Sequence, residues 1–228
     1  MTATEQLEAK IGASFKNKDL LKEALTHRSY LNERPSWPLP HNERLEFLGD
    51  AVLELVISED LFRTFPDFPE GQMTMLRAAL VNYQMLARVA GDIDLNSFLL
   101  MSRGENRDRG KAREVILANA LEALIGAIHM DLGFEAARTF IRRFILIYLE
   151  EILATKSYKD AKSELQEIVQ ERLRNTPTYK VLEEHGPAHQ RTFVIGVFFG
   201  DEQVAQGSGT SKQEAETAAA KKALEKYR

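Results

Sequence analysis

The stretch "HNERLEFLGDAVL", His41–Leu53, is apolar enough for the core of a folded protein, yet it carries several carboxylates. On a helix that advances about 100° per residue, spacings of three and four return to nearly the same face. Glu43, Glu46, Asp50 and Glu54 therefore share one narrow stripe, and apolar side chains fill most of the remaining circumference. So wide an apolar arc favours a buried helix, although acids on an ordinary surface helix remain the alternative interpretation.

A second apolar segment, "VILANALEALIGAI" at residues 115–128, repeats this pattern with Asn119 and Glu122 three positions apart. A buried carboxylate is costly without a partner, which is a cation, a metal or a hydrogen-bonding group. If the two stripes face each other, they supply four oxygen-bearing side chains: Glu46, Asp50, Asn119 and Glu122. Such a pocket suits Mg²⁺ or Mn²⁺, which activate water and stabilise charge on a phosphodiester. A salt bridge to Arg44, Arg77 or another buried arginine is the competing interpretation.

Composition restricts the class of protein. The 228 residues are 44% hydrophobic and 28% charged, as is usual for globular proteins, and they contain no cysteine. A disulfide framework and a cysteine nucleophile are therefore excluded. The first residues, "MTATEQLEAK", lack the features of a signal peptide, and the apolar runs fall short of the roughly 20 residues of a membrane span. We expect a cytoplasmic protein with no membrane partner.

The hydrophobic period changes once along the chain. It is helical from about Leu7 to Ile152, where residues 134–153 predict one long amphipathic helix. After a linker at about 154–160, the segments read helix, three short strands and helix, which predicts an antiparallel sheet with two helices on one face. Ser211 and Glu214 are spaced as a capping box for the last helix. The expected domains are 1–155 and 156–228.

The net charge of −4 argues against simple electrostatic attraction to nucleic acid over the whole chain. Residues 159–228, however, hold 11 basic and 11 acidic residues, whereas residues 1–158 hold 19 and 23. The deficit of positive charge therefore lies entirely in the first part. The second part can still carry a basic face, and we expect Lys212, Lys221 and Lys222 to cluster on one side of it.

The quoted stretch resembles the signature of the ribonuclease III family. The similarity extends over nearly the whole chain, through "THRSYLNE", "EGQMTMLRAALVN", "ILANALEALIGAIHMDLG" and a C-terminal part like a double-stranded-RNA-binding domain. The resemblance implies an all-α endonuclease domain followed by a small α+β (α-β-β-β-α) RNA-binding domain. It further implies a homodimeric, Mg²⁺-dependent endoribonuclease that cuts both strands of an RNA duplex and leaves 5′-phosphate and 3′-hydroxyl ends. Ribosomal RNA precursors, with some messenger and transfer RNAs, are the substrates that it implies.

Carried over by position, the resemblance makes Glu46, Asn119 and Glu122 metal ligands, Asp50 and Glu122 the catalytic residues, and Glu43 a nearby acid. The family usually has Asp where this chain has Asn119, which keeps a carbonyl oxygen but removes one negative charge. A double-stranded-RNA-binding protein that no longer cleaves is therefore the alternative function. We interpret His27 as a structural hydrogen-bonding residue rather than a base.

The C-terminal part matches the RNA-binding pattern in three elements, because A-form RNA is read through 2′-hydroxyls of its minor groove and through phosphates. The first helix and the loop "HGPAHQ" would contact successive minor grooves, and the start of the last helix would bind phosphate with Lys212 and backbone N–H groups. The expected RNA-binding residues are Ser163, Gln166, Glu167, Gln170, Gly186, Pro187, His189, Ser211 and Lys212. Taken singly, each also has a plain explanation as solvated surface, a turn or a helix cap.

Overall fold

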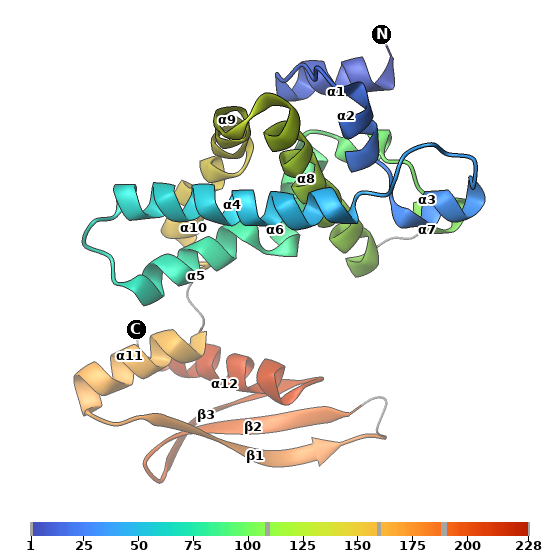
Figure 1. Cartoon of the computed structure of the whole chain (residues 1–228). Helices are drawn as coiled ribbons and strands as arrows, with labels where there is room; N and C mark the ends of the chain where they lie inside the picture. Colours follow the sequence, from blue (N-terminus) through green and yellow to red (C-terminus); the bar gives the residue numbers. More distant parts are fainter. Residues whose placement is uncertain (1, 108–109, 159–160, 188–190, 228) are drawn as a thin grey trace. The chain divides into compact units, whose positions relative to one another are not determined.

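The computed structural model describes residues 2–107, 110–158, 161–187 and 191–227. It divides into two compact units, Met1–Tyr158 and Lys159–Arg228, which are described separately below. The first unit is helical, and the second combines helices with a small sheet (Figure 1). The expected fold class, a helical domain followed by an α-β-β-β-α domain, is confirmed.

The first unit is built from α-helices joined by short turns. Its helices are α1 Ala3–Ile11, α2 Lys18–Ala24, α3 Arg28–Glu33, α4 Glu43–Thr64, α5 Glu70–Val81, α6 Tyr83–Asp92, α7 Arg103–Arg107, α8 Lys111–Leu132, α9 Phe134–Phe144 and α10 Leu149–Thr155. Two 3₁₀ turns, η1 Leu95–Phe98 and η2 Leu146–Tyr148, complete it. Side chains cap several helices, as Asn17 does for α2 and Asn82 for α6 by accepting backbone N–H groups.

The predicted single helix over residues 134–153 is wrong, because the helix ends at Phe144. At Ile145 the backbone φ is −110°, which departs from the usual helical value. A 3₁₀ turn follows, and α10 starts at Leu149. The two halves bury different surfaces, since α9 packs on α8 and α4 whereas α10 packs on α5. Ile145 itself is fully buried at the break, so the turn lets the chain follow the core rather than leave it.

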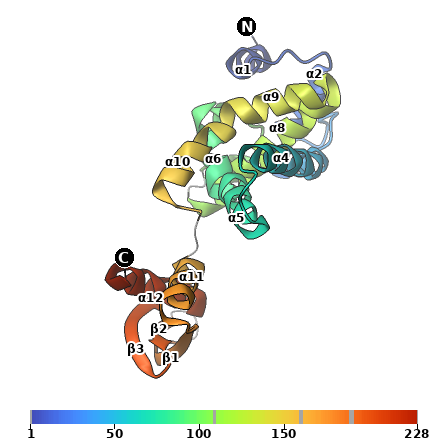
Figure 2. The same cartoon turned by 90° about the vertical axis from the view of Figure 1, so that its left-hand side faces the viewer.

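Helix α8 lies at the centre of the first unit, where it contacts α4, α6, α9 and α2 (Figures 1 and 2). Among the described helices, it is the one that is long and apolar enough to cross a membrane by length and composition. Half of its apolar stretch is buried inside the unit, and its buried side chains belong to the same cluster as those of α4. Its apolar character therefore reflects its place in the protein core.

Two glycines allow α4 and α8 to cross with their backbones in contact. A Cβ atom at Gly49 would lie 1.7 Å from the carbonyl oxygen of Glu122, and one at Gly126 would lie 2.2 Å from that of Leu45. Real Cβ atoms do not approach other atoms this closely, so any side chain at either position requires the helices to separate. Both glycines lie in otherwise helical segments, where glycine is unfavourable unless packing requires it.

The start of α4 is held by a junction of three chain segments. Leu100 N–H donates to the carbonyl of Leu25 (2.8 Å), and His27 N–H donates to that of Leu100 (2.9 Å). Asn42 N–H, just before α4, donates to the carbonyl of Thr26 (2.9 Å). Both Thr26 and Asn42 are buried. The junction therefore fixes residues 26–28 beside the first turn of α4.

The second unit packs two helices on one face of a three-stranded antiparallel sheet. Its elements are α11 Ala161–Leu173, β1 Pro177–His185, β2 Thr192–Phe199, β3 Glu202–Gly209 and α12 Lys212–Tyr227, with the strands in the order β1-β2-β3. Gly207 and Gly209 on β3 leave room for α12, because a Cβ atom there would lie 2.2 Å from Ala219 N and 2.7 Å from Ala215 N. Small residues on both elements thus bring the alanine-rich helix directly onto the strand.

The predicted capping box at α12 is half formed. Ser211 Oγ accepts the N–H of Glu214 (3.2 Å), as expected. The Glu214 carboxylate, however, accepts from the N–H and the hydroxyl of Thr210 (both 2.7 Å) rather than from Ser211. The return contact therefore ties the end of β3 to the helix.

The helix crossing yields a stability prediction. We expect Gly49→Ala to destabilise the first unit by about 3 kcal/mol or more, because the added methyl group cannot be accommodated without moving a backbone. The matched control is Gly91→Ala in α6, where a Cβ atom meets nothing within 4 Å. That change should be neutral or stabilise the helix by up to about 1 kcal/mol. Urea unfolding followed by circular dichroism measures both, and a Gly49→Ala chain as stable as its parent would contradict the crossing.

Candidate functional site

The predicted acidic stripe of α4 lies at the crossing with α8. Glu46 precedes Gly49 by one turn of the helix and Asp50 follows it directly. Glu46 is half-buried, whereas Glu43 and Asp50 are exposed. The part of α4 that touches α8 therefore has carboxylates on both sides of the contact.

On α8, the carbonyl of Glu122 is the group that Gly49 approaches. The side chains of Asn119 and Glu122 are half-buried, and they lie one turn apart on the same helix. The crossing thus brings the acids of α4 and those of α8 into one region, as the two stripes predicted. Gly49 and Gly126, which allow this close approach, were not predicted from the sequence. A glycine inside each of the two acidic helices is the sequence feature that could have indicated it.

Two of the carboxyl groups in this region, Glu46 and Glu122, have a raised pKa. Burial, followed by the charges of Asp50 and Glu46, raises the pKa of Glu122 to about 8. Burial also raises the pKa of Glu46, with further contributions from Glu43 and Asp50. Near neutral pH, Glu122 therefore holds a proton for much of the time when no cation is nearby.

The alternative interpretation, a salt bridge, does not fit the described residues. No basic side chain of that part of the chain lies within 4 Å of the Glu46, Asp50 or Glu122 carboxylates. Arg77 donates instead to Ser58 Oγ (2.8 Å). The negative charge at the crossing is consequently not balanced by an ion pair there.

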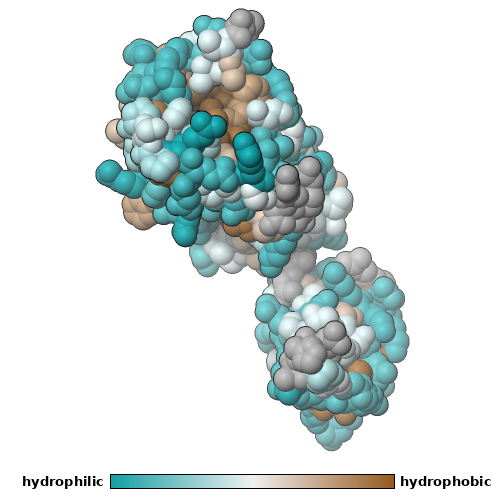
Figure 3. All heavy atoms as spheres, turned by 90° about the vertical axis from the view of Figure 1, so that its right-hand side faces the viewer, coloured by the Kyte–Doolittle hydropathy of each residue, from teal (hydrophilic) through white to brown (hydrophobic). Residues whose placement is uncertain are grey.

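A pocket of about 520 Å³ opens beside the first turn of α4. It is lined by Glu43, Glu46 and Asn119 among the predicted residues, together with His27, Arg28, Asn42, Glu105, Ala112, Val115 and Ile116. Asp50 and Glu122 do not line it. Seen from the side of α3 and α7, hydrophilic side chains dominate this end of the unit and surround an apolar patch (Figure 3).

The donor atoms match a hard divalent cation in chemistry. All four predicted side chains offer oxygen, and a cation would offset the burial and the neighbouring negative charges that raise the pKa of Glu122. Among the residues that the structure describes, however, no three histidine, aspartate or glutamate side chains are grouped tightly enough to hold a metal ion. The carboxylates therefore act on one another through charge across the crossing, and they are not gathered around one point.

His27 has the structural role that its sequence context predicted. Its Nδ1 accepts the N–H of Ser29 (3.3 Å) and lies 2.8 Å from the Ser29 hydroxyl, which caps the short helix α3. Burial lowers the pKa of His27, which favours a neutral ring, and the nearby Glu105 carboxylate partly opposes this. His27, Arg28 and Glu105 line the same pocket as Glu46, which no spacing in the sequence indicates.

In the second unit, the predicted residues of α11 share one face. Ser163, Gln166, Glu167 and Gln170 are all exposed, opposite the buried Leu165 and Val169. Gly186, with a φ of +88°, and Pro187 are also exposed at the end of β1. The predicted His189 lies outside the described residues.

The start of α12 lies beside the start of β2. Lys212 Nζ is 5.7 Å from the centre of the Phe193 ring, and Ser211, the preceding residue, is exposed. Because His185 at the end of β1 pairs with Thr192 at the start of β2, Lys212 lies at the same end of the sheet as Gly186 and Pro187. Two of the three predicted RNA-binding elements are thus neighbours.

The expected cluster of three lysines is wrong. Lys212 and Lys221 lie nine residues apart on a single helix, so they point in opposite directions and are about 13 Å apart along its axis. Lys221 lines a separate pocket with Ser208 and Thr217, which Lys212 does not line. A basic face, if it includes Lys212, must therefore be completed by residues of other elements.

Comparisons with known proteins agree with both units. A family model described as Ribonuclease-III-like matches residues 17–149, and the Double-stranded RNA binding motif matches residues 161–227. The protein called Ribonuclease 3 from Carboxydothermus hydrogenoformans is 48% identical over 219 residues, which cover 96% of this chain and 93% of that protein. The Ribonuclease 3 of Desulforamulus reducens is 45% identical over 220 residues, with 96% and 89% coverage.

Solved structures are similar to the first unit. A crystal structure of the nuclease domain of Ribonuclease III from Campylobacter jejuni is 48% identical, with a TM-score of 0.57 over 64% of this chain and 95% of that one. Another structure of that domain, with a TM-score of 0.56 and 48% identity, is described in terms of flexibility in a region involved in dimer formation. It covers 62% of this chain and 94% of its own.

The raised pKa of Glu122 predicts how stability depends on pH in the absence of metal. A carboxyl group with a folded-state pKa near 8 and an ordinary pKa of 4.5 when unfolded keeps its proton longer in the folded chain. Its contribution is therefore fully present below about pH 4.5 and is lost progressively as the pH rises to about 8. In EDTA, the melting temperature of the parent should fall across this window more than that of Glu122→Gln. Parallel pH profiles for the two chains would show that Glu122 has an ordinary pKa.

Proposed function

This chain belongs to the ribonuclease III family, and on that premise we propose that its α4–α8 crossing is the active site of a double-stranded-RNA endoribonuclease. The observation that carries the proposal is the group of carboxylates at Glu46, Asp50 and Glu122, which have no basic partner among the described residues. The second unit, which matches the double-stranded-RNA binding motif, would hold the duplex for cleavage.

The family generally uses Mg²⁺, and the chemistry of the donor set fits this ion. In this proposal Glu46, Asn119 and Glu122 hold Mg²⁺, with Mn²⁺ as a substitute, and Asp50 and Glu122 are the catalytic residues. When bound, the ion would neutralise phosphate charge and make water a better nucleophile. Glu43, exposed at the edge of the same pocket, adds negative charge.

The reaction is hydrolysis of a phosphodiester. The oxygen of water forms a new bond to phosphorus, the bond to the 3′-oxygen breaks, and a proton passes to that oxygen. The products are a 5′-phosphate and a 3′-hydroxyl end. The raised pKa of Glu122 belongs to the site without a cation. With the ion bound, its carboxylate would be ionised and would help to hold the ion beside the phosphate.

Several further assignments follow from the family. We propose that the endonuclease domain ends and the RNA-binding domain begins within about 154–160, and that the protein acts in the cytoplasm. Ribosomal RNA precursors, with some messenger and transfer RNAs, would be its substrates. In the second domain, Ser163, Gln166, Glu167, Gln170, Gly186, Pro187, His189, Ser211 and Lys212 are the proposed contacts to RNA.

A second candidate function rests on Asn119. Its amide lines the pocket with Glu43 and Glu46 but carries no charge, so the site has less negative charge to hold a divalent ion. A chain that binds double-stranded RNA and cleaves it poorly would follow. The two candidates differ in whether activity depends on Glu122.

We expect the parent chain to cleave a perfect RNA duplex in Mg²⁺. Glu122→Ala should reduce the cleavage rate by about 100-fold or more, which exceeds the usual loss for a residue that only supports a metal ligand. Asn119→Asp should lower the Mg²⁺ concentration needed, because it restores a charged ligand. Glu54→Gln is the matched control, since Glu54 continues the acidic stripe away from the site and its loss should leave the rate unchanged.

Two outcomes decide the matter. If the parent forms no product in Mg²⁺ or Mn²⁺ while it still binds the duplex in a gel-shift assay, the binding-only function is correct. If cleavage is unaffected by Glu122→Ala, the chain is an enzyme but its active site lies elsewhere.

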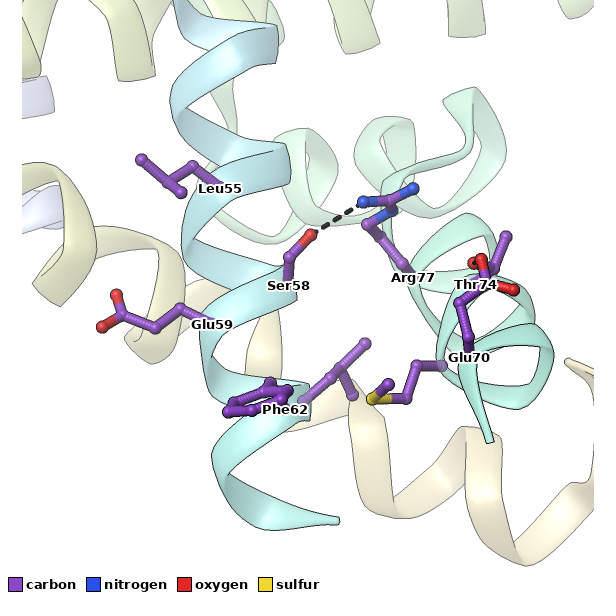
Figure 4. A pocket seen from close by; sticks show the side chains of 9 residues that line it. Leu55, Ser58, Glu59, Phe62, Glu70, Thr74 and Arg77 are labelled. Atoms are coloured by element: carbon purple, nitrogen blue, oxygen red, sulfur yellow. Dashed lines mark hydrogen bonds between the residues drawn. The ribbon is translucent and has the colours of Figure 1, made fainter. Parts of the chain in front are cut away.

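We also propose that α4 forms the interface of a homodimer. Phe47, Leu55 and Phe62 are 81%, 57% and 70% exposed, and their spacing of eight and seven residues places them on nearly one face of the helix. Figure 4 shows a pocket between α4 and α5 beside this row, where Ser58 of α4 accepts a hydrogen bond from Arg77 of α5. Leu55, Phe62 and Met73 also line this pocket. An apolar side chain of a second copy fits such a pocket.

Leu55→Glu should convert the dimer to monomers, because it places a charge in the middle of this apolar row. Sedimentation equilibrium of the purified chain measures the change. Met130→Glu is the control, since Met130 is also an exposed apolar residue (58%) but lies on α8. A monomeric parent, or a dimer that survives Leu55→Glu and dissociates with Met130→Glu, would contradict this interface.

A further inference from the structure

The pocket beside α4 contains acids but must receive an anion. An RNA strand that enters it carries phosphate groups, which carboxylates repel, so at least one wall has to offer hydrogen-bond donors. Among the described residues that line the pocket, donors are found on His27, Arg28, Asn42 and Asn119. Asn119 is already assigned to the carboxylate site, which leaves the wall formed by His27, Arg28 and Asn42, where the Asn42 N–H donates to the carbonyl of Thr26.

Two of these three donors are already engaged. The exposed Arg28 guanidinium lies 3.5 Å from the Glu43 carboxylate, so its positive charge is partly offset, although it keeps further N–H donors. The Asn42 amide donates to the carbonyl of Ala24 (3.4 Å) from a buried position. His27 is the remaining residue of this wall, and one of its two ring nitrogens has no partner among the described residues.

The hydrogen bonds of His27 determine which nitrogen carries its proton. Nδ1 accepts the backbone N–H of Ser29 (3.3 Å), and a backbone N–H can only donate, so Nδ1 is unprotonated. The Ser29 hydroxyl lies 2.8 Å from the same nitrogen, and its oxygen accepts the N–H of Ser102 (3.0 Å). Its hydrogen is therefore directed to Nδ1. The ring of His27 is neutral in this arrangement, with its proton on Nε2.

The ring is also fixed in position. His27 N–H donates to the carbonyl of Leu100, and the residue before it is buried and accepts the N–H of Asn42. With Nδ1 turned toward Ser29 and the side chain lining the pocket, Nε2 is the nitrogen left to face the pocket. A donor placed this rigidly loses little entropy when it binds a ligand.

We propose that His27 binds the RNA strand, with its Nε2–H donating a hydrogen bond to a phosphate oxygen in the pocket beside α4. The inference rests on the proposed function, to which it adds a substrate-binding residue outside the carboxylate group. A neutral donor suits this wall because a cation would pair with Glu43 or Glu46, as Arg28 does, and these carboxylates would then compete with the phosphate for it. Through Nδ1 the same residue still caps α3.

Two variants separate the two roles of the ring. In His27→Asn, the side-chain oxygen replaces Nδ1 as the helix cap, but no donor reaches the position of Nε2. In His27→Gln, the amide N–H reaches that position, but the cap is lost. We expect His27→Asn to keep the stability of the parent and to slow single-turnover cleavage of an RNA duplex on the order of 10-fold, as for a lost hydrogen bond to a charged group. His27→Gln should be less stable and cleave faster than His27→Asn.

The opposite pattern would overturn the proposal. If His27→Asn cleaves like the parent while His27→Gln loses activity together with stability, His27 is a helix cap only. In either case the parent still cleaves, so the proposed function is judged separately from the role of His27.

A second measurement does not depend on cleavage. In the full chain, ¹⁵N NMR of the histidine rings should show Nδ1 of His27 unprotonated and Nε2 protonated. Addition of an RNA duplex in EDTA should shift the Nε2–H resonance and slow its exchange with water. An unchanged resonance at saturating RNA would refute the proposal, whereas a shift in a chain that binds but does not cleave RNA would support it and refute only the endonuclease function.

Discussion

The contact between the backbones of α4 and α8 is the constraint on which the rest of the first unit depends. Gly49 and Gly126 let the helices approach until the carbonyls of Glu122 and Leu45 occupy the space of the missing side chains. This closeness brings the carboxylates of the two helices near enough to repel one another. The repulsion would be weaker if ordinary side chains separated the helix axes by the usual distance of about 8–10 Å. The unfavourable electrostatics are tolerated because many buried apolar residues on both helices hold the crossing together.

Much of the fold and of the acidic group follows from spacing alone. Three- and four-residue intervals place Glu46, Asp50 and Glu122 on defined faces, and the change of period after residue 153 separates the helical part from the sheet. These features are local, so a single sequence contains them. The break at Ile145 is different, because it depends on which surfaces the two halves of the segment bury, and amphipathic periodicity continues across it.

Other features depend on what lies outside the chain or far along it. Phe47 and Leu55 look like core residues in the sequence, yet they are exposed, because an apolar residue in a helical pattern does not reveal whether the fold of the same chain covers it. The place of His27 in the pocket depends on the junction with Leu100, more than seventy residues away. The opposite directions of Lys212 and Lys221, by contrast, could be predicted from the sequence, because nine residues on a single helix turn the side chain by about half a circle.

The glycine crossing also has a consequence for how this protein can change over generations. In an ordinary core, a larger residue on one helix is compensated by a smaller one opposite, so sequences drift in pairs. No such exchange exists at Gly49 and Gly126, since each faces backbone, which no substitution can shorten. A larger residue at either position therefore has no single compensating substitution on the facing helix, so any variant that keeps this crossing should keep both glycines.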